Sequence, residues 1–152
     1  MLLLPKKLVL EAYENSTPRR WCVGPLQLQL GKDPWKVAVA SMLLCRTRRA
    51  KAEPCMDELL REWQGPEALA RADAAEIESV IRPCGLHRQR ARQLVRFSSL
   101  WFSEYDDLRE LPGVGLYVAD AVGLFCFGCT ELSCSDGVLR EYAEGLCEAL
   151  RT

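Results

Sequence analysis

The most informative stretch of the sequence is residues 111–128, which read LPGVGLYVADAVGLFCFG. Gly113 and Gly115 permit a tight turn whose backbone N–H groups can come close to a phosphate. The apolar run that follows, 116–127, predicts a buried helix, and the N-terminus of that helix is a favourable place for an anion. An ordinary turn between two helices would look the same, so the surrounding sequence has to decide between the two interpretations.

Helical signals continue on both sides of this stretch, and no segment alternates in the way of a convincing strand. Asp33 followed by Pro34 is typical of a helix start, and apolar residues then recur at helical spacing. Further helices are expected from Thr47 to about Gln64, from Glu67, from Asp73, over residues 87–105, and from Asp136. Residues 1–31 are expected to be an irregular lead-in and residues 32–152 a single domain. The predicted fold is all-α.

The composition is that of one small globular domain. The chain has 152 residues, of which 49% are hydrophobic and 27% are charged, with a net charge of -1. No apolar run reaches the roughly 18 residues that a membrane-spanning helix needs. The opening Met1–Leu4 is too short for a signal peptide and is soon followed by Pro5 and two lysines.

Charge is unevenly distributed along the chain. Residues 79–103 contain no acidic residue but hold Arg82, Arg88, Arg90, Arg92 and Arg96, and a second basic cluster comprises Arg46, Arg48, Arg49 and Lys51. A basic run is usually a solvated helix face. Two such clusters favour an anionic partner more than a net charge of -1 suggests, because phosphate binding depends on the local field.

The eight cysteines raise the question of a metal site. Cys22, Cys45, Cys55 and Cys84 are dispersed and are expected to be small buried hydrophobic residues. Cys126 and Cys129 form a C-x-x-C pair, with Cys134 and Cys147 further on, so zinc or an iron–sulfur cluster has to be considered. No histidine of matching spacing completes such a site, and a buried helix end is the simpler interpretation.

The order of motifs resembles the helix-hairpin-helix (HhH-GPD) DNA glycosylase superfamily. The hairpin is followed by an apolar helix and then by Asp136-Gly137-Val138-Leu139-Arg140. Within that family, Asp33–Lys36, Leu44–Thr47, Gly85–Leu86 and Arg90–Arg92 look like the glycosylase domain attached to a methyl-CpG-binding domain in vertebrates. The resemblance covers about residues 26–152 and implies an enzyme that excises thymine or uracil from G·T and G·U mismatches.

The resemblance makes Asp136 the catalytic carboxylate. Cleavage of an N-glycosidic bond builds positive charge on the sugar. A nearby ionised carboxylate either stabilises this charge or helps to position water. Asp136 is also a natural N-cap, and both roles are compatible because a carboxylate has two oxygens. Tyr117 stands where lyase-competent relatives carry a Schiff-base lysine, and a phenol cannot perform that amine chemistry. A monofunctional glycosylase is therefore implied, with Tyr117 either against the flipped base or sugar or in the core.

The resemblance also assigns residues that hold the base and the DNA. Leu26 and Gln27 match base-pocket positions, and an amide can both donate to and accept from a pyrimidine edge. Because a base must leave the stack before it is cut, Arg46 would enter the vacated space and Leu86 would wedge beside the orphan guanine. Without the resemblance, a surface arginine and a core leucine are the simpler interpretations. The hairpin residues Leu111, Gly113, Val114 and Gly115 would grip the DNA.

The chain departs from the family pattern after the aspartate. Iron–sulfur relatives carry four spaced cysteines there, whereas only Cys147 follows Asp136, so neither a cluster nor another cofactor is expected. Gly137-Val138 replaces the basic residues of the relative, which leaves the base preference open.

The expected partner is double-stranded DNA with a mismatched or damaged base, bound by a monomer and without a membrane. A nuclear location is implied for a eukaryotic source and a cytoplasmic one otherwise. Two alternative functions stay open. One is a helix-hairpin-helix module that binds DNA without catalysis, and the other is a glycosylase for another base, such as adenine opposite an oxidised guanine.

Overall fold

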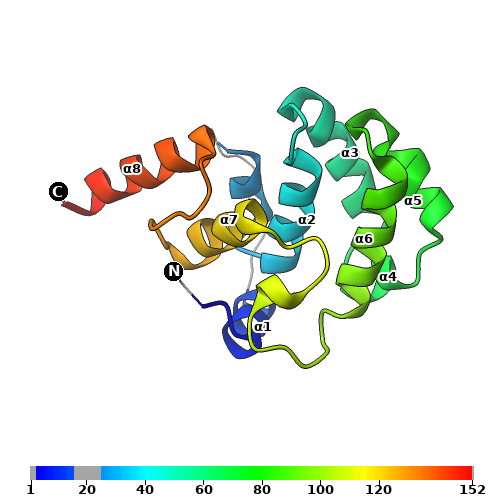
Figure 1. Cartoon of the computed structure of the whole chain (residues 1–152), viewed down its shortest axis with the longest axis horizontal. Coiled ribbons are helices and arrows are strands. Elements are labelled where there is room, and N and C mark those ends of the chain that lie inside the picture. Colours follow the sequence, from blue (N-terminus) through cyan, green and yellow to red (C-terminus); the bar gives the residue numbers. More distant parts are fainter. Residues whose placement is uncertain (1–2, 16–24, 152) are drawn as a thin grey trace.

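The computed structural model describes residues 3–15 and 25–151, and these contain helices but no strand, which confirms the all-α prediction (Figure 1). The elements in chain order are α1 (Lys6–Glu14), η1 (Leu26–Leu30), α2 (Pro34–Leu44), α3 (Arg49–Glu62), α4 (Pro66–Ala70), α5 (Ala74–Ile81), η2 (Arg82–Cys84), α6 (His87–Ser99), η3 (Leu108–Glu110), α7 (Leu116–Phe127) and α8 (Gly137–Arg151). Elements labelled η are 3₁₀ helices. None of the described helices is both long and apolar enough to cross a membrane.

Helices α2 and α7 pack against each other at the centre of the molecule. Both are apolar on nearly all sides, as helices surrounded by protein are, and every side chain from Val37 to Leu43 is buried. Figure 1 shows α3, α4, α5 and α6 on one side of this pair and α8 on the other. Trp35 reaches from α2 to α6, where its indole Nε1 donates to Ser98 Oγ at 3.1 Å. The central pair therefore joins the two sides of the fold.

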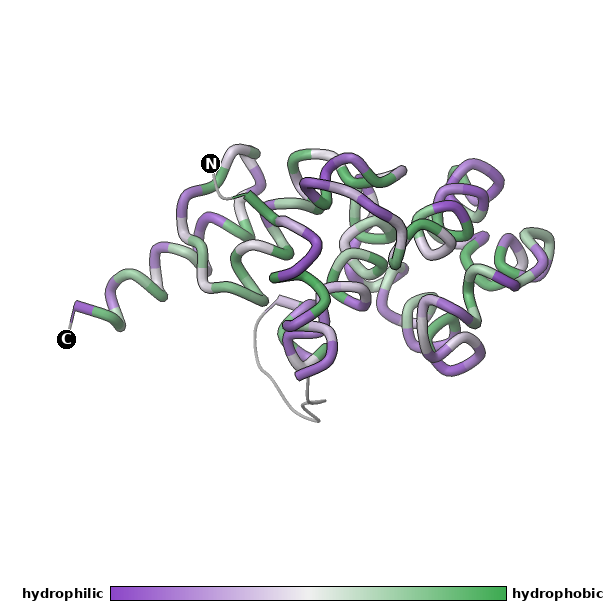
Figure 2. The backbone as a smooth tube through the Cα atoms, turned by 90° about the horizontal axis from the view of Figure 1, so that it is seen from below, coloured by the Kyte–Doolittle hydropathy of each residue, from purple (hydrophilic) through white to green (hydrophobic). Residues whose placement is uncertain are grey.

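Several helix starts lie where the sequence predicts them. Asp33 Oδ1 accepts a hydrogen bond from Lys36 N at 3.0 Å, and Asp73 Oδ1 accepts one from Ala75 N at 3.0 Å. Helix α7 covers the predicted 116–127, and Asp136 precedes the first residue of α8. Figure 2 shows hydrophobic and hydrophilic residues alternating along α8, as in an amphipathic helix.

The expectation of an irregular lead-in is wrong for residues 6–14, which form α1, and residues 26–30 form η1. Long-range contacts stabilise this segment. The backbone N–H of Leu4 donates to Asp107 Oδ2 at 3.0 Å, and the Tyr13 ring meets Trp101 edge-on with centroids 5.8 Å apart. Residues 6–14 also carry a local helical signal, because KKLVLEAYE is rich in helix-forming residues, and the prediction missed it.

Two helix boundaries also differ from the prediction. Thr47 does not cap a helix, because α3 begins at Arg49 and its N-cap residue makes no side-chain cap. The Thr47 hydroxyl instead bonds to Cys84 O at 3.1 Å. Helix α6 ends at Ser99, well before residue 105. The chain turns there through Trp101 N, which donates to Ser98 O at 3.3 Å.

Candidate functional site

Asp136 stands at the start of α8 with one carboxylate oxygen engaged. Its Oδ1 accepts from Leu139 N at 2.9 Å, the bond of an N-cap. Its Oδ2 has no hydrogen-bond partner within 3–15 and 25–151. The side chain is half-buried and lines two adjoining hollows. The arrangement confirms the predicted cap and leaves one oxygen to interact with a bound molecule.

The loop that leads to Asp136 is anchored by a carboxylate in α7. Asp120 is buried, and its Oδ2 accepts from Ser133 N at 2.8 Å and from Cys134 N at 2.7 Å. Two bonds from consecutive amides to one charged oxygen are strong and directional. Asp120 therefore fixes the loop two residues before Asp136.

Tyr117 and Gln27 meet across the larger hollow. Gln27, from η1, is buried, and its Nε2 donates to Tyr117 Oη at 3.1 Å and to Ser41 Oγ at 3.4 Å. This network sets the amide orientation, and Gln27 Oε1 has no partner among the residues that the structure describes. Burial, reinforced by the charge of Asp136, raises the pKa of Tyr117 to about 12, so the phenol keeps its proton at neutral pH.

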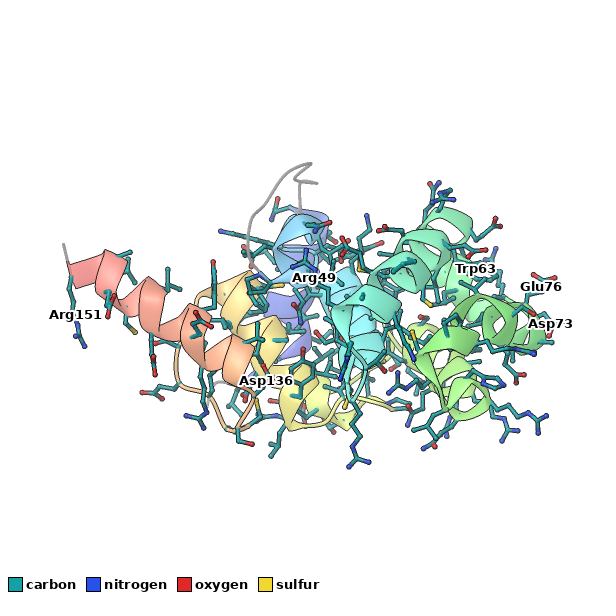
Figure 3. The ribbon with its side chains drawn as sticks, turned by 90° about the horizontal axis from the view of Figure 1, so that it is seen from above. Arg49, Trp63, Asp73, Glu76, Asp136 and Arg151 are labelled. Atoms are coloured by element: carbon teal, nitrogen blue, oxygen red, sulfur yellow. The ribbon has the colours of Figure 1, made fainter. Side chains whose placement is uncertain are left out.

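The larger hollow has a volume of about 580 Å³. Leu26, Gln27, Tyr117 and Asp136 all line it, so the structure brings together four residues to which the resemblance gives roles in the base pocket and the chemistry. The remaining lining residues are Pro25, Leu44, Thr47, Arg48, Arg49, Val138, Glu141 and Tyr142. Figure 3 shows Asp136 and Arg49 at the starts of α8 and α3.

Arg46 and Leu86 are both exposed on sharp turns. Arg46 lines a smaller hollow of about 250 Å³, which it shares with Tyr117 and Asp136. The Leu86 side chain is 62% exposed, so the simpler interpretation as a core leucine is wrong. The backbone φ angles, 58° for Arg46 and 47° for Leu86, lie in the left-handed region, which L-residues enter at a cost.

The hairpin 111–115 combines a buried underside with an exposed backbone. The side chains of Leu111 and Val114 are buried, so any contact that these residues make with DNA comes from the backbone. Gly113 has a φ of 81°, and a Cβ there would lie 3.2 Å from Met42. The first N–H groups of any helix have no partner within it. Gly115, which precedes α7, has no side chain to cap them.

The cysteines divide differently from the prediction. Cys55 and Cys84 are buried as expected, Cys45 is exposed, and Cys22 lies outside the described residues. Cys126, Cys129, Cys134 and Cys147 are free thiols. Within the described ranges, no three His, Cys, Asp or Glu side chains are grouped so that they could hold a metal ion.

The sequence analysis predicted neither the role of Asp120 nor the burial of Arg90. Arg90 is the buried member of the basic run, whereas Arg88, Arg92 and Arg96 are exposed. Both residues had a usable signal. Asp120 is a lone acid inside an apolar helix, where a charge needs a partner, and Arg90 shares a helix face with Leu94 and Phe97.

A family model described as HhH-GPD superfamily base excision DNA repair protein matches residues 39–146 of the chain. The chain is 36% identical over 107 residues to a thymine-DNA glycosylase of Aeropyrum pernix, covering 65% of this chain and 48% of that protein. It is 32% identical over 125 residues to a methyl-CpG-binding domain protein 4-like protein of Arabidopsis thaliana, covering 78% of this chain and 28% of that protein. The chain thus spans about half or less of the length of these relatives.

Solved structures show the same fold. A thermostable thymine-DNA glycosylase superposes with a TM-score of 0.63 at 22% identity, covering 93% of this chain and 76% of the other. A non-covalent complex of endonuclease III with DNA gives a TM-score of 0.61 at 19% identity, covering 94% of this chain and 73% of the other.

Proposed function

The chain belongs to the HhH-GPD superfamily of base excision DNA repair proteins, and from this premise we propose that it is a monofunctional DNA glycosylase for mismatched thymine and uracil. The observation that carries the proposal is the convergence of Asp136, Tyr117 and Gln27 on one hollow of about 580 Å³. Relatives named thymine-DNA glycosylase and thymine/uracil-DNA glycosylase, each 36% identical over 107 residues, support the choice of base.

In the proposed reaction the bond between the sugar C1′ and the pyrimidine N1 breaks, and its electron pair leaves with the base. The unpartnered Oδ2 of Asp136 stabilises the positive charge that develops on the sugar. Water then supplies a hydroxyl group to C1′ and a proton to the departing base, which leaves an abasic site. Asp136 keeps its place throughout, because Oδ1 stays bonded to Leu139 N.

Tyr117 supports the monofunctional part of the proposal. A lyase step needs an amine that forms a Schiff base with C1′, and the phenol of Tyr117 is held protonated by its raised pKa of about 12. A protonated phenol can donate a hydrogen bond to a flipped nucleotide but cannot bond covalently in this way. The DNA strand should therefore remain intact after base release.

Gln27 supports the preference for thymine and uracil over cytosine. Its Nε2 is engaged by Tyr117 and Ser41, so the amide oxygen is the group left to meet a base. Thymine and uracil carry an N3–H donor, whereas N3 of cytosine is an acceptor and would face another acceptor. A buried polar mismatch of that kind discriminates strongly between substrates.

Extrusion of the base would use the exposed turns and the hairpin. The hairpin N–H groups and the N-terminus of α7 would hold a phosphate, while Arg46 fills the vacated position and Leu86 wedges beside the orphan guanine. Arg48 and Arg49 line the hollow and place positive charge next to it. A base in a weak mismatch needs less energy to leave the stack, which favours G·T and G·U sites.

A substrate panel tests the proposed function. Wild-type protein is incubated with duplexes that carry G·U, G·T, G·C, A·U or adenine opposite 8-oxoguanine, and the products are separated with and without alkali. We expect strand breaks at G·U and G·T only after alkali, the sign of an abasic site without lyase action. Breaks before alkali would contradict the monofunctional assignment, and release of adenine would replace the pyrimidine assignment.

The same panel separates the enzyme from a module that only binds DNA. A binding module would retain G·T or G·U duplexes in a gel-shift measurement and would release no base from any of them.

A further inference from the structure

Arg90 is a buried cation surrounded by backbone carbonyls. It lies on α6 with its side chain buried against the end of α2. Its Nη1 donates to Leu43 O at 3.1 Å, to Thr47 Oγ1 at 3.0 Å and to Cys84 O at 3.4 Å, and its Nη2 donates to Cys45 O. Within residues 3–15 and 25–151, no carboxylate forms an ion pair with it.

These acceptors belong to two separate turns. Leu43, Cys45 and Thr47 form the end of α2 and the turn after it, and Cys84 ends η2. The last carbonyls of a helix lack partners in their own helix and carry partial negative charge, so a guanidinium fits there. Thr47 strengthens the connection, because its hydroxyl also bonds to Cys84 O at 3.1 Å.

Each turn carries one exposed non-glycine residue with positive φ. Arg46 lies between Cys45 and Thr47, and Leu86 lies two residues after Cys84. An exposed residue in a strained conformation needs a surrounding structure that holds it there. Arg90 contacts Cys45 O and Thr47 Oγ1, which lie on either side of Arg46, and the carbonyl of Cys84, two residues before Leu86.

We propose that Arg90 is a positioning residue that sets the spacing of Arg46 and Leu86, so that both side chains enter the DNA at one site. The proposal rests on the proposed function, because it assigns Arg46 and Leu86 to base extrusion. A lysine could not replace Arg90, since its single ammonium cannot span acceptors on two turns as a planar guanidinium does.

A double-mutant cycle provides the test. Rates of uracil release from a G·U duplex are measured for Arg46→Ala and Leu86→Ala, each in the wild type and in Arg90→Lys. We expect each alanine substitution to slow release about tenfold in the wild type and less than about threefold in Arg90→Lys. The effect is smaller in Arg90→Lys because side chains that are already misplaced contribute less to the rate. Arg71→Lys, the same change at an exposed arginine just after α4 and outside the basic clusters, is the control and should leave both factors at their wild-type size.

A purely structural role gives a different result. If Arg90→Lys only lowers the folded fraction, all rates fall by one factor and the effects of the alanine substitutions stay tenfold, which would overturn the proposal. Should Arg90→Lys fail to fold, Thr47→Val removes the hydroxyl that joins the two turns, and the same reduction is expected in a smaller amount.

Amide hydrogen exchange tests the positioning without catalysis. In Arg90→Lys we expect faster exchange in both turns, residues 45–47 and 84–87, with unchanged exchange in the hairpin 111–115. Faster exchange in neither turn or in only one would overturn the proposal. If wild-type protein releases no base from any duplex, the proposed function fails, while hydrogen exchange still decides whether Arg90 holds the two turns together.

Discussion

At the scale of single residues, the site depends on side chains whose polar groups are only partly used by the fold. One carboxylate oxygen of Asp136 caps α8, and the other makes no hydrogen bond to a described residue. The amide nitrogen of Gln27 donates to Tyr117 and Ser41, and its oxygen makes no hydrogen bond to a described residue. Such divided use fixes a side chain in place and still leaves a group to interact with a substrate.

The two hairpin glycines make a matched pair for separating fold from binding. Gly113→Ala should lower the free energy of unfolding by about 1–2 kcal/mol, because the residue has positive φ and the new Cβ meets Met42. Gly115→Ala should leave stability unchanged, since a Cβ there meets nothing within 4 Å. Urea unfolding of both variants measures these two stabilities.

For Gly115→Ala we expect weaker binding to duplex DNA, because the methyl group would stand where a phosphate approaches the N-terminus of α7. Unchanged affinity in this variant would mean that the hairpin does not carry the phosphate contact.

At the scale of elements, α7 holds the loop before α8, and Asp107, at the start of η3, holds the N-terminal segment. Asp120→Ala removes the acceptor of two part-buried amides, those of Ser133 and Cys134. We expect a loss of stability of about 1–3 kcal/mol, together with a slower rate of base release at saturating enzyme, by about 10- to 100-fold, because Asp136 is misplaced.

Thermal unfolding and single-turnover kinetics together test the role of Asp120. Glu131→Gln is the control, since Glu131 is exposed in the same loop. A stability loss in Asp120→Ala without any loss of rate would show that the loop is not what places Asp136.

Asp107 gives the N-terminal segment a pH-dependent attachment. Its hydrogen bonds with Arg109 lower the pKa of this carboxyl from 3.8 to about 2, and it also accepts from Leu4 N. Because the folded-state pKa is lowered, the stabilisation is complete above about pH 4 and is lost as the pH falls through 2. Asp107→Asn should therefore be less stable than wild type at pH 7, with the difference vanishing toward pH 2.

Urea unfolding at a series of pH values tests this dependence, with Asp106→Asn as the control because Asp106 is exposed. A stability difference between Asp107→Asn and wild type that stays constant from pH 7 to pH 2 would contradict the assignment.

The sequence predicts elements well where local chemistry sets them and poorly where distant partners do. The α7 helix, the caps at Asp33 and Asp73, and the position of Asp136 follow from short patterns. Helix α1 is stabilised by contacts with Asp107 and Trp101, which no local pattern shows. The sequence places Arg90 on the buried face of α6 but does not show its partners, which are mostly backbone carbonyls.

At the scale of the whole molecule, a net charge of -1 conceals a divided surface. Arg48 and Arg49 line the larger of the two hollows beside Asp136 and Arg46 lines the smaller one, while Arg88, Arg92 and Arg96 are exposed on α6. A local positive field of this kind supports modest, salt-sensitive DNA affinity. Under the proposed function, we expect specificity to depend on the hollow and the extruded base more than on total charge.

The most direct measurement compares uracil release from a G·U duplex by wild type, Asp136→Asn and Glu141→Gln under single-turnover conditions. Asparagine keeps the oxygen that caps α8 but loses the charge, and Glu141 is a second carboxylate lining the same hollow. We expect Asp136→Asn to slow release by at least about 100-fold, with Glu141→Gln close to wild type. Equal rates for wild type and Asp136→Asn would contradict the central role of Asp136.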